Sequence, residues 1–436
     1  MIYLEDNTPR VLSFSPEKEG LRLIANQTVE SLQRKHPELL VFPQCLDDCK
    51  DDLKKQSILS LSEDIDSLGE RTMHVLPTNL VGYIGVNGTN ISITSRFSPG
   101  TGLERDFFLQ YLLQKALNVN IFNLEHSYSK DDDVFDFLML LFPGMLKQAL
   151  AQGLYKEYQT QDRNDANVKG CIDIPRHLQV NIPFNGKIAY RSREISYDNS
   201  VTELIRHAIE YINTRPLGRM LLNGDSETLG FVNQIILATP SYSKTNRNQV
   251  IRKNNKPISH PFFTKYKPLQ NLCLRILRHE RIHYSDSTNK VYGILFDMSW
   301  LWEEYLAKLL PEFNHPKNRE GLGAIYLGER GAMERYPDYY KDEAGGIVLD
   351  AKYKRDVKRD DQHQVISYMY RLRSRYGGFL MPTKVSQANH RTKLLGYGER
   401  LGYHYLEIPQ ATTSFSDFCK RIILNELSFT SEINTL

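Results

Sequence analysis

Two aspartates and one lysine have the types and spacing of a site that cuts phosphodiesters. Asp338 stands in a Pro-Asp dipeptide. Asp350 follows it twelve residues later, directly after the apolar run 347–349, and Lys352 comes two residues after Asp350. Carboxylates hold hard divalent cations, which neutralise a phosphodiester and lower the pKa of an attacking water. An ammonium group stabilises the charge that builds on phosphorus. The trio predicts metal-dependent hydrolysis, although an Asp that ends an apolar run is often only a strand terminus.

The elements around these residues must bring them together. On a β-strand successive side chains alternate between faces, so Asp350 and Lys352 point the same way. Pro337 suits the edge or the first residue of a strand. Asp338 is therefore expected to enter the site from a neighbouring strand.

A helix is predicted after this strand, at residues 361–372, because its apolar residues recur at helical spacing. Gln364 and Tyr368 are four residues apart and share one edge of the apolar stripe. We expect these two side chains to reach the active site or the nucleic-acid backbone.

A second helix is predicted upstream, at about 297–310, with a broad buried face. At about 100° per residue, Glu303 lies at the border of that face and Glu304 points nearly opposite, toward solvent. Glu303 is the better candidate for an acid that leans over a sheet-borne metal site.

Four ordered motifs together resemble a known family. They are F-D-M-x-x-L-W-E-E-Y at 296–305, Pro337-Asp338, D-A-K-Y-K at 350–354 and D-x-x-Q-x-x-x-Y at 361–368. This string resembles McrC, the endonuclease subunit of McrBC-type, modification-dependent restriction systems. The last motif also resembles the RecB-like branch of the PD-(D/E)xK nucleases. The resemblance covers roughly residues 290–410, with a weaker match upstream at 82–85, 163–170 and 197–199.

The resemblance implies a role for each site residue. Asp338, Asp350 and Glu303 would bind metal, Lys352 would be the catalytic lysine, and Gln364 and Tyr368 would support them. The implied cofactor is Mg²⁺ or Mn²⁺, since carboxylates, water and phosphate oxygens suit hard cations. The implied substrate is double-stranded DNA, and the implied partner is a McrB-like AAA+ GTPase motor.

The predicted fold is α/β, with a PD-(D/E)xK restriction-endonuclease-like domain at residues 291–436. Its mixed central sheet would be flanked by helices, with 379–382 in the next core strand. Residues 1–165 are interpreted as an N-terminal α+β region and 166–290 as a connecting strand and helix region. Locally, 82–94 predicts a hairpin around Asn87-Gly88, the acidic 47–66 predicts a helix, and 163–170 predicts a loop.

Composition restricts the class of protein. The chain has 436 residues, enough for two or three domains, and 55 basic against 52 acidic residues give a formal charge of +3. DNA affinity must therefore come from a local basic patch or a partner. No signal peptide or long apolar run is evident, so no membrane association is expected. Five scattered cysteines indicate reduced thiols, and we expect a cytoplasmic protein.

The N-terminal region, 1–165, is where we expect the motor to dock. No G-x-x-x-x-G-K-[ST] phosphate loop occurs, so the strand-like run 347–350 cannot serve as a Walker-B strand. A separate motor would have to hydrolyse the nucleotide. The alternative is that this region only packs against the nuclease.

A basic segment at 244–256 contains five basic residues and no acid. Its candidate DNA-contacting residues are Arg247, Arg252, Lys253 and Lys256. They would hold the phosphate backbone as a loop, without reading sequence. Many such runs are only solvated surface.

Two weaker motifs remain. His279-Glu280-x-x-His283 matches a metalloprotease pattern, but no third ligand is evident and the surrounding segment is basic. Cys45 and Cys49 form a C-x3-C pair without two further zinc ligands at a typical spacing.

These observations predict the cutting subunit of a GTP-driven restriction complex. The alternative is a non-catalytic accessory protein that keeps the nuclease fold to bind DNA or to regulate the motor. Replacing Asp350 with Ala separates them, because only a nuclease would lose cleavage while it keeps assembly.

Overall fold

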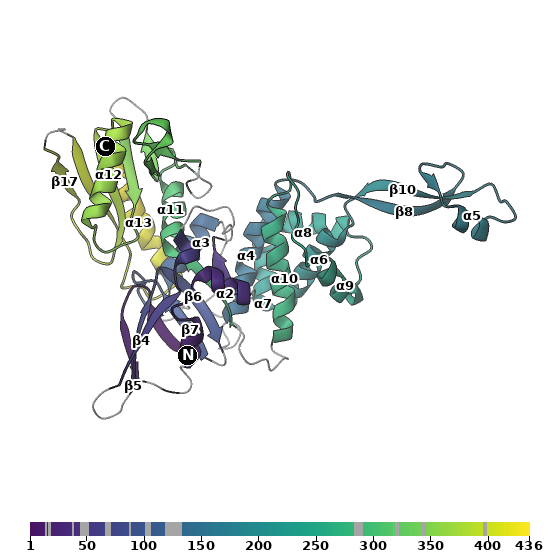
Figure 1. The fold of residues 1–436 in the computed structure, drawn as a ribbon, viewed down its shortest axis with the longest axis horizontal. Coiled ribbons are helices and arrows are strands. Elements are labelled where there is room, and N and C mark those ends of the chain that lie inside the picture. The colour runs from purple at the N-terminus through teal and green to yellow at the C-terminus, as the bar shows by residue number, and fades with distance from the viewer. Residues whose placement is uncertain are drawn as a thin grey trace. The chain divides into compact units, whose positions relative to one another are not determined.

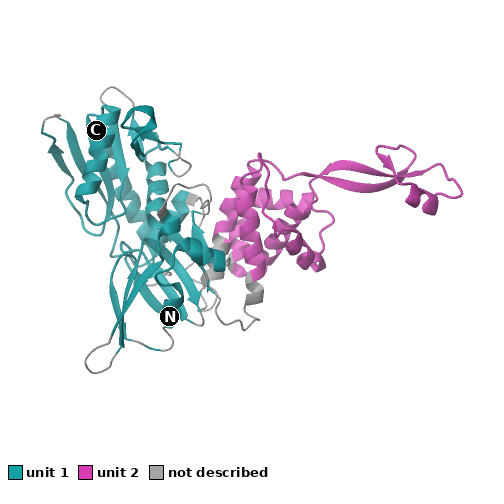
Figure 2. Cartoon of the chain, in the orientation of Figure 1, with its two compact units in different colours: residues 1–118, 286–436 teal, residues 119–285 magenta. Residues whose placement is uncertain are grey.

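The computed structural model groups the chain into two compact units, which Figure 2 shows in different colours. Unit 1 comprises residues 1–118 and 286–436, and unit 2 comprises residues 119–285. The described residues are all except 14, 16–18, 37–38, 44–51, 66–70, 87–88, 101–105, 118–132, 283–290, 317, 319–321, 342–345 and 396–398. The boundaries of these units differ from the predicted region boundaries at 165 and 290. The roles given to 1–165, 166–290 and 291–436 stay predictions.

One sheet of unit 1 joins N-terminal strands to a strand from the second segment of this unit. Its order is β1-β7-β6-β11-β3. The strands are β1 (Ile2–Glu5), β3 (Leu39–Phe42), β6 (Leu80–Val86), β7 (Thr89–Thr94) and β11 (Val291–Asp297). β6 and β7 pair antiparallel from Val86 and Thr89, which confirms the predicted hairpin; its tip, 87–88, lies outside the described residues. β11 pairs with β6 and β3, so residues from beyond unit 2 complete the N-terminal sheet.

A smaller antiparallel sheet lies in the same N-terminal part, in the order β2-β5-β4. Its strands are β2 (Arg10–Ser13), β4 (Leu59–Ile65) and β5 (Arg71–Pro77), and it is accompanied by α1 (Gly20–Ile24), α2 (Val29–Lys35) and the short 3-10 helix η2 (Asp52–Lys55). The predicted helix at 47–66 is wrong over β4, because Leu59 and Leu61 alternate with serines at the period of a strand.

The C-terminal part of unit 1 contains a five-stranded mixed sheet, in the order β14-β15-β16-β18-β17. The strands are β14 (Tyr339–Lys341), β15 (Ile347–Ala351), β16 (Tyr376–Thr383), β17 (His390–Lys393) and β18 (Arg400–Glu407). The three inner strands are parallel and the two edge strands run antiparallel to them. The predicted mixed sheet with a core strand at 379–382 is confirmed.

Helices cover this sheet, as predicted. α12 (Arg359–Leu372) packs on β15 and β16 through a core that includes Val348, Val365 and Phe379. α11 (Met298–Leu309) also contacts β15, α13 (Phe415–Asn434) contacts β18, and α3 (Phe107–Leu117) packs on α11. The indole nitrogen of Trp302 on α11 donates to the carbonyl oxygen of Leu380 at 3.1 Å. A short ribbon of β12 (Ile325–Tyr326) and β13 (Glu334–Arg335) and the 3-10 turn η7 (Glu329–Gly331) precede β14.

Unit 2 is built mainly of helices. They are α4 (Asp133–Leu150), α6 (Ser200–Asn213), α7 (Pro216–Asn223), α8 (Ser226–Ala238), α9 (Arg247–Lys253) and α10 (Tyr266–Ile282), with the 3-10 turn η5 (Lys244–Asn246) before α9. Asn199 caps α6 by accepting from the backbone of Val201 and Thr202. No helix among the described residues is long and apolar enough to cross a membrane.

An arm of paired strands extends from the helices of unit 2 (Figure 1). β8 (Glu157–Asp165) pairs antiparallel with β10 (Ile188–Ser196) along their whole length. The short strand β9 (Cys171–Ile172) and helix α5 (Ile174–Val180) form its far end. The predicted loop at 163–170 is wrong at its start, because residues 163–165 belong to β8. Residues 157–196 are called the arm.

Candidate active site on the C-terminal sheet

Asp350 and Lys352 lie at the carboxyl end of β15, between β14 and β16. The Asp350 side chain is 1% exposed, and its Oδ2 atom lies 2.7 Å from Nζ of Lys352. The backbone N–H of Lys352 donates to the carbonyl oxygen of Leu380 on β16 at 2.9 Å. The strand periodicity therefore places both groups together, as predicted.

Asp338 enters from the neighbouring strand. It directly precedes β14, where Tyr339 lies opposite Leu349 of β15. Its Oδ2 atom accepts a hydrogen bond of 2.8 Å from the backbone N–H of Ala351, which stands between Asp350 and Lys352. Two carboxylates and one ammonium group thus converge at one edge of the sheet.

The electrostatics of the pair reflect this crowding. Burial raises the pKa of the Asp350 carboxyl to about 7, the Asp338 charge adds to the rise, and Lys352 opposes it. Burial alone would lower the pKa of Lys352, but the negative charge of Asp350 beside it raises this pKa above its ordinary value. The cluster holds more negative charge than its lysine neutralises.

The donor set fits a hard divalent cation. The buried Oδ2 atom of Asp350 has no well-directed hydrogen bond, so its contact with Lys352 is an ion pair. Among the described residues no three His, Cys, Asp or Glu side chains gather as metal ligands. Mg²⁺ commonly takes one or two carboxylates and fills its other positions with water and phosphate oxygens. Asp338 and Asp350 suffice for that mode.

Gln364 and Tyr368 connect α12 to the lysine. Nζ of Lys352 donates to Oε1 of Gln364 at 3.1 Å, and Nε2 of Gln364 donates to the Tyr368 hydroxyl. That hydroxyl donates to the carbonyl oxygen of Tyr336 at 3.0 Å, two residues before Asp338. The chain of bonds fixes the direction of the ammonium group. Tyr368 is fully buried among these groups, and contact of either side chain with an active site or with nucleic acid stays a prediction.

Asp361 is a site residue that the sequence reasoning missed. It lies 3.7 Å from Nζ of Lys352 and 2.8 Å from Nζ of Lys354. Burial alone would raise the pKa of Asp361, but the hydrogen bonds from Lys354 and from the Lys358 backbone hold it below its ordinary value. Its position three residues before Gln364, on the same helix face, was the available signal.

Glu303 does not gather with Asp338 and Asp350 as a metal-ligand cluster. It lies on α11, half-buried, and its carbonyl oxygen accepts from the Tyr339 hydroxyl. The helix is thereby tied to β14, but the Glu303 carboxylate forms no three-ligand cluster with the two aspartates. Its role as a metal ligand stays a prediction. Glu304 is also half-buried, so burial does not separate the two acids as the helix pattern suggested.

A pocket of about 500 Å³ opens beside this network. Gln364 and Tyr368 contribute to its wall, and Arg335 and His363 are among the side chains around it. The pocket thus lies next to Gln364, which accepts the hydrogen bond from Lys352.

The basic segment 244–256 is helical at its centre, because Val250 and Ile251 bury one face of α9. Arg247 donates to the carbonyl oxygen of Leu277 at 2.8 Å and packs over Tyr211, whereas Arg252, Lys253 and Lys256 are exposed. The predicted loop is wrong in form, and DNA contact by these residues stays a prediction.

The two weaker motifs gain no support. His279 and Glu280 lie in α10, but their side chains and all of His283 lie outside the described residues. Cys45 and Cys49 lie outside them as well.

Fold and site together define a class: an α/β protein whose mixed sheet carries two aspartates and one lysine at one strand end. The family model of the McrBC 5-methylcytosine restriction system component matches residues 75–381. The chain belongs to this family.

One solved structure has a similar fold over nearly the whole chain. A chain of the refined half-complex from the tetradecameric assembly of Thermococcus gammatolerans McrB AAA+ hexamers with bound McrC has a TM-score of 0.50 at 14% identity, with 97% of this chain and 99% of that chain covered. A chain of the cryo-EM structure of the Thermococcus gammatolerans McrBC complex has a TM-score of 0.33 at 12% identity, with 71% and 87% covered. No curated protein matches the chain. The resemblance to an McrC-like subunit, predicted from the motifs, is confirmed.

Proposed function

We propose that this chain is the nuclease subunit of its McrBC-type restriction system, with a PD-(D/E)xK site that hydrolyses phosphodiester bonds of double-stranded DNA. The supporting observation is the convergence of Asp338, Asp350 and Lys352 at the end of β15. The cofactor is Mg²⁺ or Mn²⁺, held by Asp338 and Asp350.

Each group of the site has its own chemical role in this proposal. The bound cation supplies positive charge to the phosphate oxygens and acidity to a water molecule. Lys352 stabilises the negative charge that develops on the phosphate. Gln364 orients the lysine through its Oε1 atom, and the neighbouring Asp350 and Asp361 keep the lysine protonated. The buried position of Asp350 excludes water from one side of the site and strengthens these interactions.

The test is an Asp350→Asn variant of the full chain, assayed on modified DNA with its motor partner and Mg²⁺. We expect cleavage to be lost and assembly with the motor to be kept. Asp64→Asn is the matched control, because that carboxylate is 74% exposed on β4 and pairs only with His74 among the contacts described for it. Cleavage by the Asp350→Asn variant at the control's rate would reject the nuclease assignment and favour the accessory alternative.

The partner in this proposal is an AAA+ GTPase motor. Two observations support it: the fold is similar to a chain of an assembly of McrB AAA+ hexamers with bound McrC, and the sequence has no phosphate loop of its own. The motor would supply nucleotide hydrolysis and movement along DNA.

The arm provides a surface for that partner in addition to the predicted docking region 1–165. Apolar side chains at its far end are more than half exposed: Ile172, Ile174, Leu178, Val180, Ile182 and Phe184. Such a group of exposed apolar residues marks a protein-contact surface. Deleting 1–165 would remove the strands that pair with β11 and would break the sheet, so substitutions in the arm are the cleaner test.

A further inference from the structure

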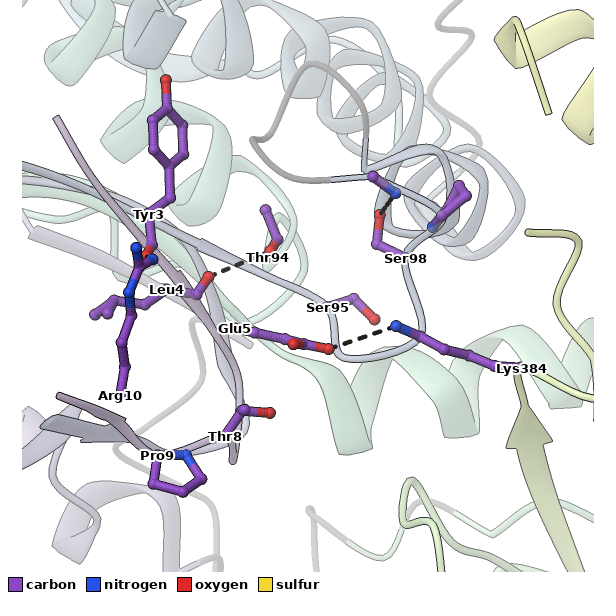
Figure 3. A pocket seen from close by; sticks show the side chains of 12 residues that line it. Tyr3, Leu4, Glu5, Thr8, Pro9, Arg10, Thr94, Ser95, Ser98 and Lys384 are labelled. Carbon is purple, nitrogen blue, oxygen red and sulfur yellow. Dashed lines mark hydrogen bonds and ion pairs between the residues drawn. The ribbon is translucent and has the colours of Figure 1, made fainter. Parts of the chain in front are cut away.

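A second pocket of unit 1, of about 300 Å³, lies between the N-terminal sheet and the carboxyl end of β16. Figure 3 shows Glu5 from β1 and Lys384, the residue after β16, facing each other beside it. Arg10 and the hydroxyl-bearing residues Thr8 and Ser98 also line it. Its wall therefore combines these polar side chains with apolar ones such as Leu4 and Pro99, and its volume exceeds that of a water molecule.

The charges at this pocket do not balance. One carboxylate oxygen of Glu5 lies 3.5 Å from Nζ of Lys384 and 3.7 Å from the guanidinium of Arg355. Arg10 adds a third cation, whose guanidinium donates to the carbonyl oxygen of Tyr3. Lys384 and Arg10 line the pocket, and Arg355 pairs with Glu5 from outside this lining. Together the three cations exceed the single carboxylate of Glu5 by two positive charges. The ion pairs are long and partly exposed, so another anion can replace the carboxylate at little cost.

The cations belong to the same sheet edge as the reactive cluster. Arg355 follows Lys352 by three residues, and Lys384 directly follows β16, which pairs in parallel with β15. The segment between Lys352 and Arg355 is held firmly. The Tyr353 hydroxyl lies 2.7 Å from Oγ of Ser95, and Arg96 donates to the Tyr353 carbonyl oxygen at 2.7 Å. The reactive cluster and these cations therefore both lie at the carboxyl ends of the parallel strands β15 and β16.

We propose that this pocket binds a phosphate group of the DNA backbone on the flank of the scissile bond, an inference that rests on the proposed nuclease function. Arg355, Lys384 and Arg10 hold the phosphate oxygens. Glu5 takes the place of the phosphate when DNA is absent and keeps the cations in position. The contacts fix the duplex on the sheet edge without reading its sequence.

The experiment measures the affinity of the full chain for a fluorescent DNA duplex at several salt concentrations, without divalent cations so that nothing is cut. We expect Lys384→Gln and Arg355→Gln each to weaken binding and to flatten the plot of log affinity against log salt by about 0.9. Lys384→Arg should restore the slope. Lys420→Gln, which removes an exposed lysine from α13, is the matched control and should leave the slope unchanged.

Glu5→Gln separates a phosphate site from a structural ion pair. If the carboxylate competes with phosphate, its removal should tighten DNA binding about two- to fivefold. A purely structural pair predicts weaker or unchanged binding together with a lower melting temperature. Unchanged slopes for Lys384→Gln and Arg355→Gln, weaker or unchanged binding by Glu5→Gln, or no salt-dependent binding at all would each overturn the proposal. Cleavage by the Asp350→Asn variant would instead overturn the nuclease function, so the two failures are distinguishable.

Discussion

The C-terminal sheet of unit 1 and the arm of unit 2 depart in opposite ways from the usual pattern, in which charged groups are exposed and apolar side chains are buried. At the end of β15 the sheet buries a carboxylate that is 1% exposed and packs another acid beside it. The arm leaves Phe184 68% exposed and Ile174 63% exposed. Buried charge in the first region points to chemistry, and exposed apolar surface in the second points to a binding partner.

Both arrangements cost stability in the isolated chain. Burying an ionised group costs several kcal/mol unless it is paired, and exposed apolar surface forgoes about 25 cal/mol per Å². Sequences tolerate such local costs mainly at functional sites. The following predictions test whether the two regions separate in this way, from the largest expected effect to the smallest.

Replacing Lys352 with Met should slow DNA cleavage on the order of 10³-fold, because the charge on the phosphate then has no ammonium group beside it. Binding to the motor should not change. Single-turnover cleavage of modified DNA measures the effect, with Lys308→Met on α11 as the exposed control. If both variants cut DNA equally fast, the buried cluster has no part in the chemistry.

Replacing Ile174 and Phe184 with Asp should weaken binding to the motor at least about tenfold, since exposed apolar contacts often dominate an interface. The melting temperature of the chain should stay unchanged, because neither side chain is buried. Pull-down and calorimetry provide the two measurements. Leu237→Asp on α8, where the leucine is 80% exposed, is the control. Equal losses for both variants would mean that the arm has no special role.

Replacing Gln364 with Leu should slow cleavage about tenfold or more, because Lys352 loses a hydrogen bond that orients its charge. Gln362→Leu is the control, since Gln362 lies on the same helix but donates to the Tyr403 hydroxyl instead. Cleavage rates at saturating DNA give the comparison. A slower control than Gln364→Leu would show that α12 acts only through its packing.

Asp106 tests whether burial alone explains the site. It is as buried as Asp350, but it accepts hydrogen bonds from the backbones of Ser95 and Leu109 and lies outside the reactive cluster. Burial raises its pKa to about 7, above the ordinary 3.8, so the folded state binds this proton more tightly than the unfolded state. The contribution to stability therefore grows as pH falls through 7.

Between pH 8 and pH 5.5 the free energy of unfolding should thus rise by about 2 kcal/mol more in the unaltered chain than in Asp106→Asn. Urea unfolding at both pH values measures the difference, and cleavage by the variant should be unaffected. An equal pH dependence in both chains would remove Asp106 as its cause.

Local patterns in the sequence predict much of the site. The period of two in β15 puts Asp350 and Lys352 on one face, and the spacing of four puts Gln364 and Tyr368 on one edge of α12. The same spacing puts Asp361 on the helix face of Gln364, but its contact with Lys352 depends on how α12 packs across β15. The helix predicted at 47–66 is wrong over 59–65, where the alternation of apolar and polar residues specifies a strand despite the acidic composition.

The residue types, their spacing and the periodicity of each segment by themselves determined the candidate aspartates and lysine, the strand and helix types of the segments around them, and the family resemblance. These depend on interactions between near neighbours in the chain. Only the tertiary structure decided that β11 completes the N-terminal sheet, that Asp361 and Glu5 bind cations from other elements, and that the arm leaves its far end uncovered. Such contacts join residues far apart in the chain, and no local pattern specifies which distant segment will pack there.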